Sequence, residues 1–381
     1  MRKSLVGVSH LQGNNWRSNT TASRLIGIFP NRLEATKHKI QDIRDISLEE
    51  LTETLVSWGE KPFRAKQVNE WLWKKNARSF DSMTNISTGL REKLKQEFSF
   101  NTVKADLIQK SSDGTIKIGF RLSDGNFIEG VLIPTSKRMT ACVSSQVGCS
   151  LNCTFCATGY LKRARNLKHY EVFDQVAIIN EMAIENYDIP LSNIVFMGMG
   201  EPLLNYNEVL HGIDNITSPD AMGMSPSRIT LSTAGITKMI RKLADDGVRF
   251  NLALSLHAAT NEKRSAIMPI NDSNSLEDLT EALNYFYDKT GSRITLEYCV
   301  INEVNDHPED AEELAAFARN IVCKINLIEY NSIENADYKS SSGNRIDRFA
   351  KQLESKRLIV NVRRSRGKDI DAACGQLANK N

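Results

Sequence analysis

The first clear pattern in the chain is a set of apolar residues at helical spacing. Residues 47–58 begin with the capping pair Ser47 and Glu50 and place apolar side chains on one helical face. Pro62 starts a second helix at its first turn. A third apolar run follows at Leu90, Leu94 and Phe98. The spacing predicts a small helical domain over residues 45–100.

Alternation with a period of two replaces this pattern over residues 101–138. The pairs Asp113-Gly114 and Asp124-Gly125 are typical β-hairpin turns. Residues 116–122 and 127–133 alternate on either side of the second turn. We therefore expect a β-hairpin that links the helical domain to the rest of the chain.

From residue 139 to residue 381, apolar β-rich runs alternate with segments of helical periodicity. Repeated βα units of this kind predict a parallel sheet. Seven candidate strands suit a full or partial (β/α) barrel, in which chemistry gathers at the strand ends. The runs are residues 140–145, 193–197, 228–232, 250–255, 293–300, 324–328 and 358–362.

Composition changes the picture only at the N-terminus. The 381 residues are 41% hydrophobic and 25% charged, with a net charge of +3, which is ordinary for a globular protein. Residues 1–40 hold seven basic residues and one acid, so the remaining chain is net negative. Residues 1–44 read as a basic, disordered tail, with an organellar transit peptide and an RNA-contacting arm as alternatives. We expect no membrane span and a cytoplasmic location.

Four of the seven cysteines fall between residues 142 and 156. Cys149, Cys153 and Cys156 form a C-x3-C-x2-C motif directly after a predicted strand, a spacing that lets three thiolates share one metal centre. A structural zinc site needs four ligands, and Cys142 could be the fourth. Three cysteines instead leave one iron of a [4Fe–4S] cluster open. The motif resembles that of the radical S-adenosylmethionine (SAM) superfamily.

Further motifs narrow this resemblance. MGMGEP at 197–202, with SQVGC, LSTAG, LSLHA, MPIN and DIDAACGQL, is similar to the RlmN and Cfr family of radical SAM RNA methyltransferases over residues 45–378. The family's fold is a radical SAM partial (β/α) barrel. By this resemblance, Gly200 and Glu201 hold the amino group of SAM. The rest of its pocket is lined by Ser232, Ser255, Leu256, His257 and Asn331.

Within the family, residues 200–202 and 363–367 resemble the RlmN branch. That branch methylates carbon 2 of an adenosine in 23S ribosomal RNA, and often of an adenosine next to the anticodon of certain transfer RNAs. The alternatives are the Cfr branch, which acts on carbon 8, and a zinc-bound RNA-binding protein without catalytic activity. The resemblance implies a [4Fe–4S] cluster, SAM and an electron donor such as flavodoxin or ferredoxin.

The resemblance also gives roles to residues outside the cluster motif. Cys374 accepts a methyl group from a first SAM, and a radical generated from a second SAM activates it for addition to the base. Cys142 then attacks the Cys374 sulfur to release the product, and Glu129 matches the family's proton acceptor. Without the resemblance, Glu129 would be a solvent-facing carboxylate. Cys299 and Cys323 lie in apolar runs, which predicts buried structural thiols.

Two basic runs flank the predicted mouth of the site, where they could neutralise RNA phosphates. The first consists of Lys162, Arg163, Arg165 and Lys168, and the second of Arg363, Arg364, Arg366 and Lys368.

Overall fold

The computed structural model describes residues 41–379, so most of the predicted tail, residues 1–44, lies outside the described residues. Helix α1 (Leu48–Ser57) begins with the predicted capping box between Ser47 and Glu50. Helix α2 (Phe63–Trp73) begins one residue later than expected because Pro62 is its N-cap. Helix α3 (Thr88–Glu97) completes the helical unit.

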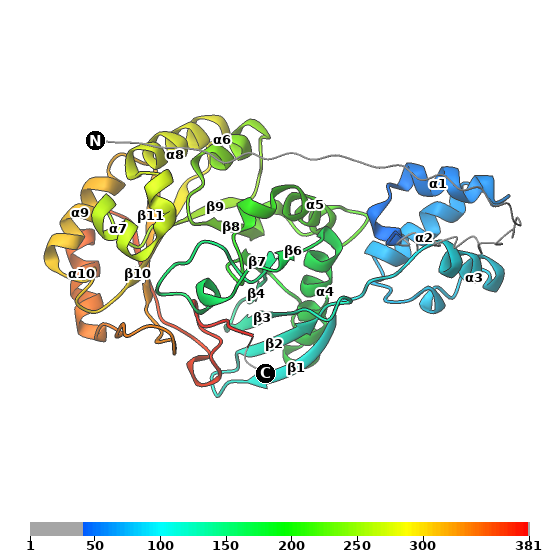
Figure 1. Cartoon of the computed structure of the whole chain (residues 1–381), viewed down its shortest axis with the longest axis horizontal. Helices are drawn as coiled ribbons and strands as arrows, with labels where there is room; N and C mark the ends of the chain where they lie inside the picture. The colour runs from blue at the N-terminus through cyan, green and yellow to red at the C-terminus, as the bar shows by residue number, and fades with distance from the viewer. Residues whose placement is uncertain (1–40, 380–381) are drawn as a thin grey trace, which may run out of the picture. The chain divides into compact units, whose positions relative to one another are not determined.

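Residues 41–379 form one ten-stranded sheet in the order β1-β2-β3-β4-β7-β8-β9-β10-β11-β12 (Figure 1). The first three strands pair antiparallel and form the predicted extension, with an additional strand, β1, that the sequence analysis did not name. The bounds of this extension are β1 (Lys104–Lys110), β2 (Ile116–Arg121) and β3 (Phe127–Pro134).

Within the ten-stranded sheet, the strands from β4 to β12 are parallel neighbours, which confirms the predicted partial barrel. Each of the seven predicted apolar runs overlaps one of them. Their bounds are β4 (Met139–Cys142), β7 (Asn193–Phe196), β8 (Ile229–Thr233), β9 (Asn251–Ser255), β10 (Ile294–Val300), β11 (Cys323–Glu329) and β12 (Val360–Arg363). A separate two-stranded sheet joins β5 (Gln146–Val147) to β6 (Arg165–Asn166).

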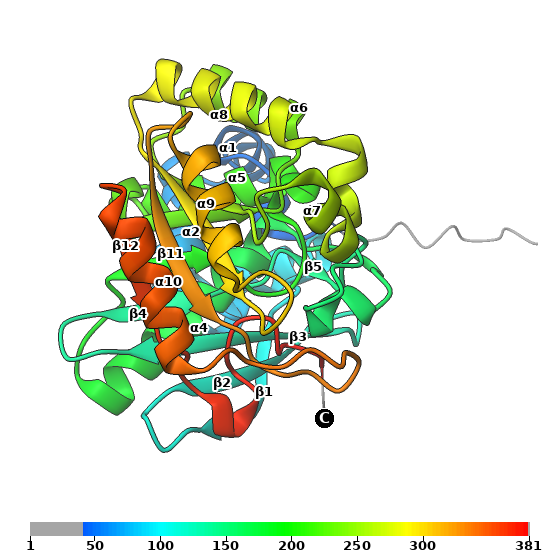
Figure 2. The ribbon, with the colours of Figure 1, turned by 90° about the vertical axis from the view of Figure 1, so that its left-hand side faces the viewer.

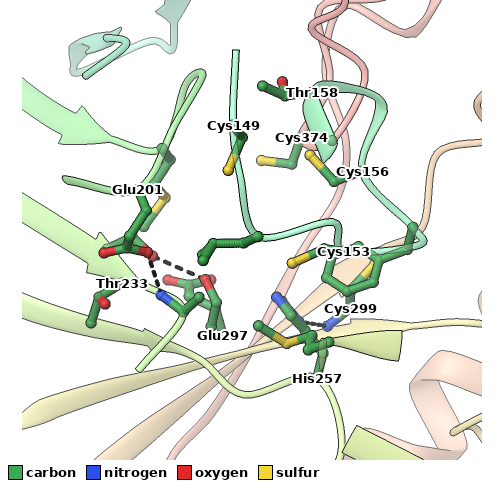
Figure 3. A pocket seen from close by; sticks show the side chains of 18 of the residues that line it. Cys149, Cys153, Cys156, Thr158, Glu201, Thr233, His257, Glu297, Cys299 and Cys374 are labelled. Carbon is green, nitrogen blue, oxygen red and sulfur yellow. Dashed lines mark hydrogen bonds between the residues drawn. The ribbon is translucent and has the colours of Figure 1, made fainter. Parts of the chain in front are cut away.

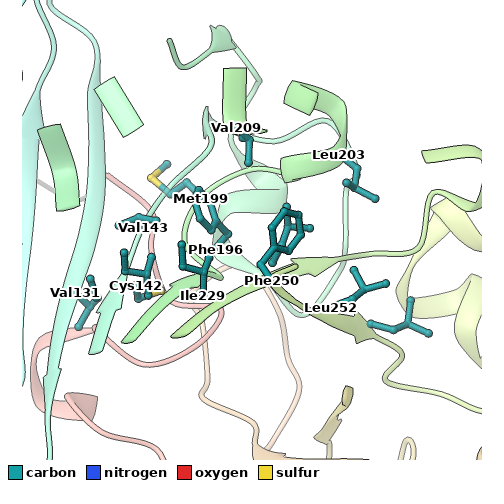
Figure 4. Packing of buried hydrophobic residues seen from close by; sticks show 14 of the residues in the cluster. Val131, Cys142, Val143, Phe196, Met199, Leu203, Val209, Ile229, Phe250 and Leu252 are labelled. Atoms are coloured by element: carbon teal, nitrogen blue, oxygen red, sulfur yellow. The ribbon is translucent and has the colours of Figure 1, made fainter. Parts of the chain in front are cut away.

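Helices follow the parallel strands and cover their outer side (Figure 2). All seven residues of β10 are buried, as expected for a parallel strand covered on both faces. Figure 4 shows part of the resulting core, where Phe196, Ile229 and Leu252 come from neighbouring strands. The helices are α4 (His169–Tyr187), α5 (Tyr206–Thr217), α6 (Thr237–Asp245), α7 (Asn261–Ile267), α8 (Leu276–Thr290), α9 (Pro308–Ala318) and α10 (Gly343–Ser355).

A buried arginine joins the helical unit to the barrel. Arg44 pairs with Asp42 at 3.1 Å and with Asp174 of α4 at 2.9 Å. Trp73, at the end of α2, packs edge-on against Phe173 of α4 with ring centroids 5.1 Å apart. No helix within residues 41–379 is long and apolar enough to cross a membrane.

Candidate active site

A cavity of about 160 Å³ opens where the parallel strands end (Figure 3). One water needs only ~10–15 Å³ by the same measure, so the cavity can hold a much larger group. Residues that end or follow β7, β8, β9 and β10 form one side of its wall. The facing side is formed by Cys149, Cys153, Cys156, Cys374 and Gly375. The site therefore lies at the edge of the barrel where chemistry was predicted.

The three cysteines of the motif line this one cavity from a single loop. Burial raises the pKa of Cys149 to about 11, although a hydrogen bond from the Leu151 amide opposes part of this increase. Burial also raises the pKa of Cys156, which the amides of Gly159 and Thr158 lower. Desolvated thiolates of this kind need positive charge nearby, and metal ions supply it to their cysteine ligands. Three soft sulfur donors around an open cavity fit an iron–sulfur cluster.

The alternative of a zinc site requires Cys142 to lie close to the other three cysteines. Within residues 41–379, no group of three or more His, Cys, Asp or Glu side chains lies close enough to hold a single metal ion. Cys142, the fourth ligand in that reading, belongs to the main hydrophobic cluster instead (Figure 4). Among the residues that the structure describes, Cys142 does not line the cavity with Cys149, Cys153 and Cys156.

The Glu201 carboxylate is buried, with 3% of the residue exposed, and faces the cavity. Its oxygens accept hydrogen bonds from the amides of Leu203 at 3.0 Å and Ala234 at 2.8 Å. Burial raises the pKa of Glu201, and these amides lower it. Gly200 precedes it with a φ of +93°, and a Cβ there would lie 2.5 Å from the Cβ of Gln146. Only glycine lets the turn place Glu201 in this position.

His257 is held in a single tautomer. Its Nδ1 accepts a hydrogen bond from the amide of Cys299 at 2.9 Å, so the proton of the neutral ring lies on Nε2. Burial, followed by the charge of Arg264, lowers the pKa of His257 to about 3. The ring therefore presents a neutral imidazole in the cavity wall.

Five of the seven predicted SAM-contacting residues line the cavity: Gly200, Glu201, Ser232, Ser255 and His257. Within the described part of the chain, Leu256 and Asn331 are not among the residues that line it. The Leu256 side chain is fully buried in the main core. The Asn331 amide instead donates to the carbonyl of Cys374 at 3.4 Å and to that of Glu329 at 3.1 Å.

The loop with Cys374 is bonded directly to the loop of the three cysteines. The Ala157 amide donates to the carbonyl of Gly375 at 2.7 Å, and the Thr158 hydroxyl donates to that of Leu377 at 2.7 Å. Gly375 has a φ of +84°, and a Cβ there would lie 3.3 Å from the carbonyl oxygen of Phe155. These contacts hold Cys374 beside Cys156 in the cavity wall (Figure 3).

Arg363, which belongs to the second basic run and to the motif at 363–367, lies close enough to two cysteines to affect their charge. Cys374 is an exposed residue that lines the cavity. The protein atoms that desolvate its thiol raise the pKa of that thiol, and the Arg363 charge lowers it. Burial and the Cys374 thiolate raise the pKa of Cys142 to about 12, and Arg363 again lowers it. Arg363 itself pairs with buried Glu297 at 3.3 Å. One guanidinium therefore stabilises the thiolate form of both cysteines.

The alternating pattern alone predicts that Glu129 faces solvent, but Glu129 is fully buried. It pairs with buried Lys117 at 2.8 Å and accepts hydrogen bonds from the amides of Ala378 at 2.8 Å and Asn379 at 3.2 Å. The C-terminal segment, residues 374–379, thus covers the face of β3 that the alternating pattern predicts to face solvent. Within the described residues, Glu129 lies outside the cavity wall.

The remaining cysteines differ from each other. Cys299 is buried as predicted, and it also lines the cavity. Cys323 was predicted to be buried, but it is only partly buried because it begins the strand β11. All seven cysteines lie within the described residues and are free thiols.

Most of the basic residues near the site are paired with carboxylates. In the second run, Arg364 and Lys368 both pair with Glu329, at 2.9 Å and 2.7 Å. In the first run, Arg165 and Lys168 pair with acidic partners at 2.7 Å and 3.0 Å. Lys162 and Arg163 are exposed. Much of each run therefore anchors loops.

Comparison with known proteins places the chain in a family. Residues 41–99 match the model of the ribosomal RNA large subunit methyltransferase N-terminal domain, and residues 143–318 match that of the radical SAM superfamily. A relative from Cytophaga hutchinsonii, a probable dual-specificity RNA methyltransferase RlmN, is 58% identical over 91% of this chain and 95% of its own. The chain belongs to the RlmN family of radical SAM methyltransferases.

Other relatives agree with this assignment. The dual-specificity RNA methyltransferase RlmN of Anaeromyxobacter dehalogenans is 42% identical over 88% of this chain and 91% of its own. A crystal structure of a radical SAM methyltransferase from Sphaerobacter thermophilus superposes with a TM-score of 0.85 at 38% identity, covering 89% of this chain and all of that one. Membership in the RlmN family implies SAM and, typically, a [4Fe–4S] cluster.

Proposed function

We propose that the protein methylates carbon 2 of an adenosine in 23S ribosomal RNA and of an anticodon-loop adenosine in certain transfer RNAs. The names of its relatives, dual-specificity RNA methyltransferases, support two RNA substrates. The observation that carries the proposal is the position of Cys374, which shares one cavity with Cys149, Cys153 and Cys156. A thiol that accepts a methyl group must lie beside the site that activates that group.

The substrate carbon explains why a thiol is needed. Carbon 2 of adenine is electron-poor and does not attack the methyl group of SAM, whereas a thiolate does. In the proposed reaction, the Cys374 thiolate displaces the methyl group from a first SAM, and S-adenosylhomocysteine leaves. Arg363 assists because its charge favours the thiolate. The methyl group then sits on a sulfur in the cavity wall.

The cofactor and the second SAM bind in the same cavity. Cys149, Cys153 and Cys156 would hold the cluster, with one iron left open. Glu201 and Gly200 would bind the SAM amino group, and Ser232, Ser255 and His257 would line the rest. When bound, the cluster and the second SAM together would supply the radical chemistry that removes a hydrogen atom from the methyl group on Cys374. The buried Glu201 carboxylate suits an ammonium group, whose charge would offset its desolvation.

The two residues behind the predicted SAM contacts act by holding others in place. The Leu256 carbonyl accepts a hydrogen bond from Arg264 at 3.2 Å, and Asn331 holds the backbone of Cys374. Both belong to the positioning machinery of the proposed site.

Product release would use two further residues, Cys142 and Glu129. Cys142 would attack the Cys374 sulfur, which forms a disulfide and breaks the bond between that sulfur and the methylene carbon on the base. The released carbon would take up one proton and become the methyl group of the product. Glu129 would accept a proton from the base. Because Glu129 is bonded to the amides of Ala378 and Asn379, the C-terminal segment has to move before Glu129 can do so. Release of the product and movement of this segment are therefore linked.

The rest of the chain would serve the RNA and the electron supply. We assign residues 45–100 to a helical accessory domain, 101–138 to the hairpin linker and 139–381 to the catalytic barrel. The exposed side chains of Lys162 and Arg163 are placed to contact phosphates. A donor such as flavodoxin or ferredoxin would reduce the cluster, and the RNA substrates place the enzyme in the cytoplasm.

The test is mass spectrometry of nucleosides after anaerobic incubation of the cluster-loaded enzyme with SAM, a reductant and unmodified ribosomal or transfer RNA. We expect 2-methyladenosine with the unaltered enzyme and with Cys323→Ala, which changes a thiol outside the cavity wall. Cys374→Ala should give none. A product of 8-methyladenosine, or no product from the unaltered enzyme, would contradict the proposal.

A further inference from the structure

Arg264 is a fully buried arginine that pairs with no carboxylate among the described residues. It lies on α7 and is 0% exposed. Within residues 41–379 its hydrogen bonds go to neutral oxygens, namely Leu256 O at 3.2 Å, Asn271 Oδ1 at 2.8 Å, Ala234 O at 2.6 Å and Ser255 O at 3.3 Å. By contrast, buried Arg44 pairs with two carboxylates. A buried charge without a counter-charge is costly, so the position of Arg264 needs an explanation.

The loop of three cysteines packs against the same helix. The Thr154 amide donates to the carbonyl of Ile267, the last residue of α7, at 3.0 Å. Cys153 packs in a small apolar cluster with Ile267 and Met268. Burial lowers the pKa of Arg264 to about 10, and the charged group that raises it is the Cys153 thiolate. Arg264 thus lies on the helix against which the loop of Cys153 packs, and it binds the carbonyls of the cavity-lining residues Ala234 and Ser255.

We propose that Arg264 is the fixed counter-charge of the iron–sulfur cluster and raises its reduction potential. A cluster held by three thiolates is anionic, and reduction adds one more negative charge. Net charge and local electrostatics set the potential of such clusters. A buried guanidinium, held by four oxygens, therefore stabilises the reduced form more than the oxidised one. This inference rests on the proposed cluster site.

The same hydrogen bonds tie the cation to the SAM pocket. Ala234 follows β8, and Ser255 and Leu256 lie at the end of β9. Arg264 therefore fixes two strand ends of the cavity wall as well as placing a charge. An experiment has to separate these two effects, since either could change activity.

The test measures the midpoint potential of the cluster in the anaerobically loaded enzyme by spectroelectrochemistry. Arg264→Met removes the charge, whereas Arg264→Lys keeps the charge but loses the guanidinium fork. For Arg264→Met we expect at least a tenfold fall in the ratio of reduced to oxidised cluster at a fixed potential. For a one-electron couple, this is a shift of about 59 mV to more negative values. Arg264→Lys should stay near the unaltered enzyme.

Lys263→Gln is the matched control. Lys263 precedes Arg264 on the same helix, but its ammonium group bonds to Asp310 at 2.6 Å and Glu313 at 3.3 Å, on α9 and away from the cavity. Its loss removes an equal charge and should leave the potential unchanged. If Lys263→Gln shifts the potential as much as Arg264→Met does, the effect is general and the inference is wrong.

The other outcomes are equally decisive. A loaded Arg264→Met protein with an unchanged potential overturns the inference. If Arg264→Met cannot hold a cluster, Arg264→Lys decides alone. A lysine variant with a lowered potential, or with no cluster, shows that hydrogen-bond geometry rather than charge is the contribution of Arg264. Failure of the unaltered enzyme to bind any cluster would instead refute the proposed function.

Discussion

Gly375→Ala is the substitution that tests most sharply how the reactive thiol is held. Gly375 follows Cys374 and has a φ of +84°, and a Cβ there would lie 3.3 Å from the Phe155 carbonyl oxygen. A side chain in this backbone region costs about 1–2 kcal/mol. The contact is with backbone, so the loop has to shift by a few tenths of an ångström as well.

The expected effect follows from this cost. A free-energy change of 1–2 kcal/mol alters a local equilibrium by a factor of about 5–30. Hydrogen exchange reports such local opening. We therefore expect the protection of the Ala157, Ala378 and Asn379 amides, which bond within or to the C-terminal segment, to fall by that factor. Methyl transfer to Cys374 should slow as well, because the thiol is displaced from the cavity.

Gly247→Ala provides the control. Gly247 also has a positive φ, of +62°, but nothing lies within 4 Å of a Cβ at that position. The two substitutions introduce the same kind of backbone strain, and only one of them touches the site. Gly247→Ala should leave the three protected amides and Cys374 methylation unchanged. Unchanged protection in Gly375→Ala would show that the segment is not held by the contacts described, and the reasoning would fail.

Three further variants test individual residues. Arg363→Gln should raise the pKa of Cys374, because the Arg363 charge lowers it, so the pH profile of Cys374 alkylation should move to higher pH; an unmoved profile refutes that role. Glu129→Gln removes the ion pair with Lys117 and should increase proteolysis of the C-terminal segment. Cleavage at the same rate as in the unaltered enzyme would contradict this role of Glu129. Cys142→Ala should bind the cluster, methylate Cys374 and accumulate a nuclease-sensitive protein–RNA adduct, whereas normal turnover would exclude Cys142 as the resolving thiol.

The sequence predicted the elements whose signals are local. The capping pair Ser47 and Glu50 lies within four residues, and each parallel strand is an apolar run bounded by turns. The motif of three cysteines is equally local, because its spacing alone predicts that the three side chains share one site, and all three line one cavity.

The interactions that depend on distant parts of the chain could not be read in this way. Glu129 is buried because residues 378 and 379, about 250 positions later, cover it. Asn331 reaches the backbone of Cys374 rather than the cavity. The charges of Arg363 and Arg264 can act on cysteine thiols only because the fold brings these side chains near them. Patterns of two to four residues carry no information about such contacts.

The central claim, that Cys374 carries the carbon before the RNA does, has a direct isotopic test. The enzyme is supplied with SAM whose methyl group carries three deuterium atoms, and the 2-methyladenosine product is analysed by mass spectrometry. The proposed reaction removes one of these atoms while the carbon is on Cys374, so the product methyl group should retain two. A product that retains all three would show direct transfer of an intact methyl group to the base, and would contradict the account.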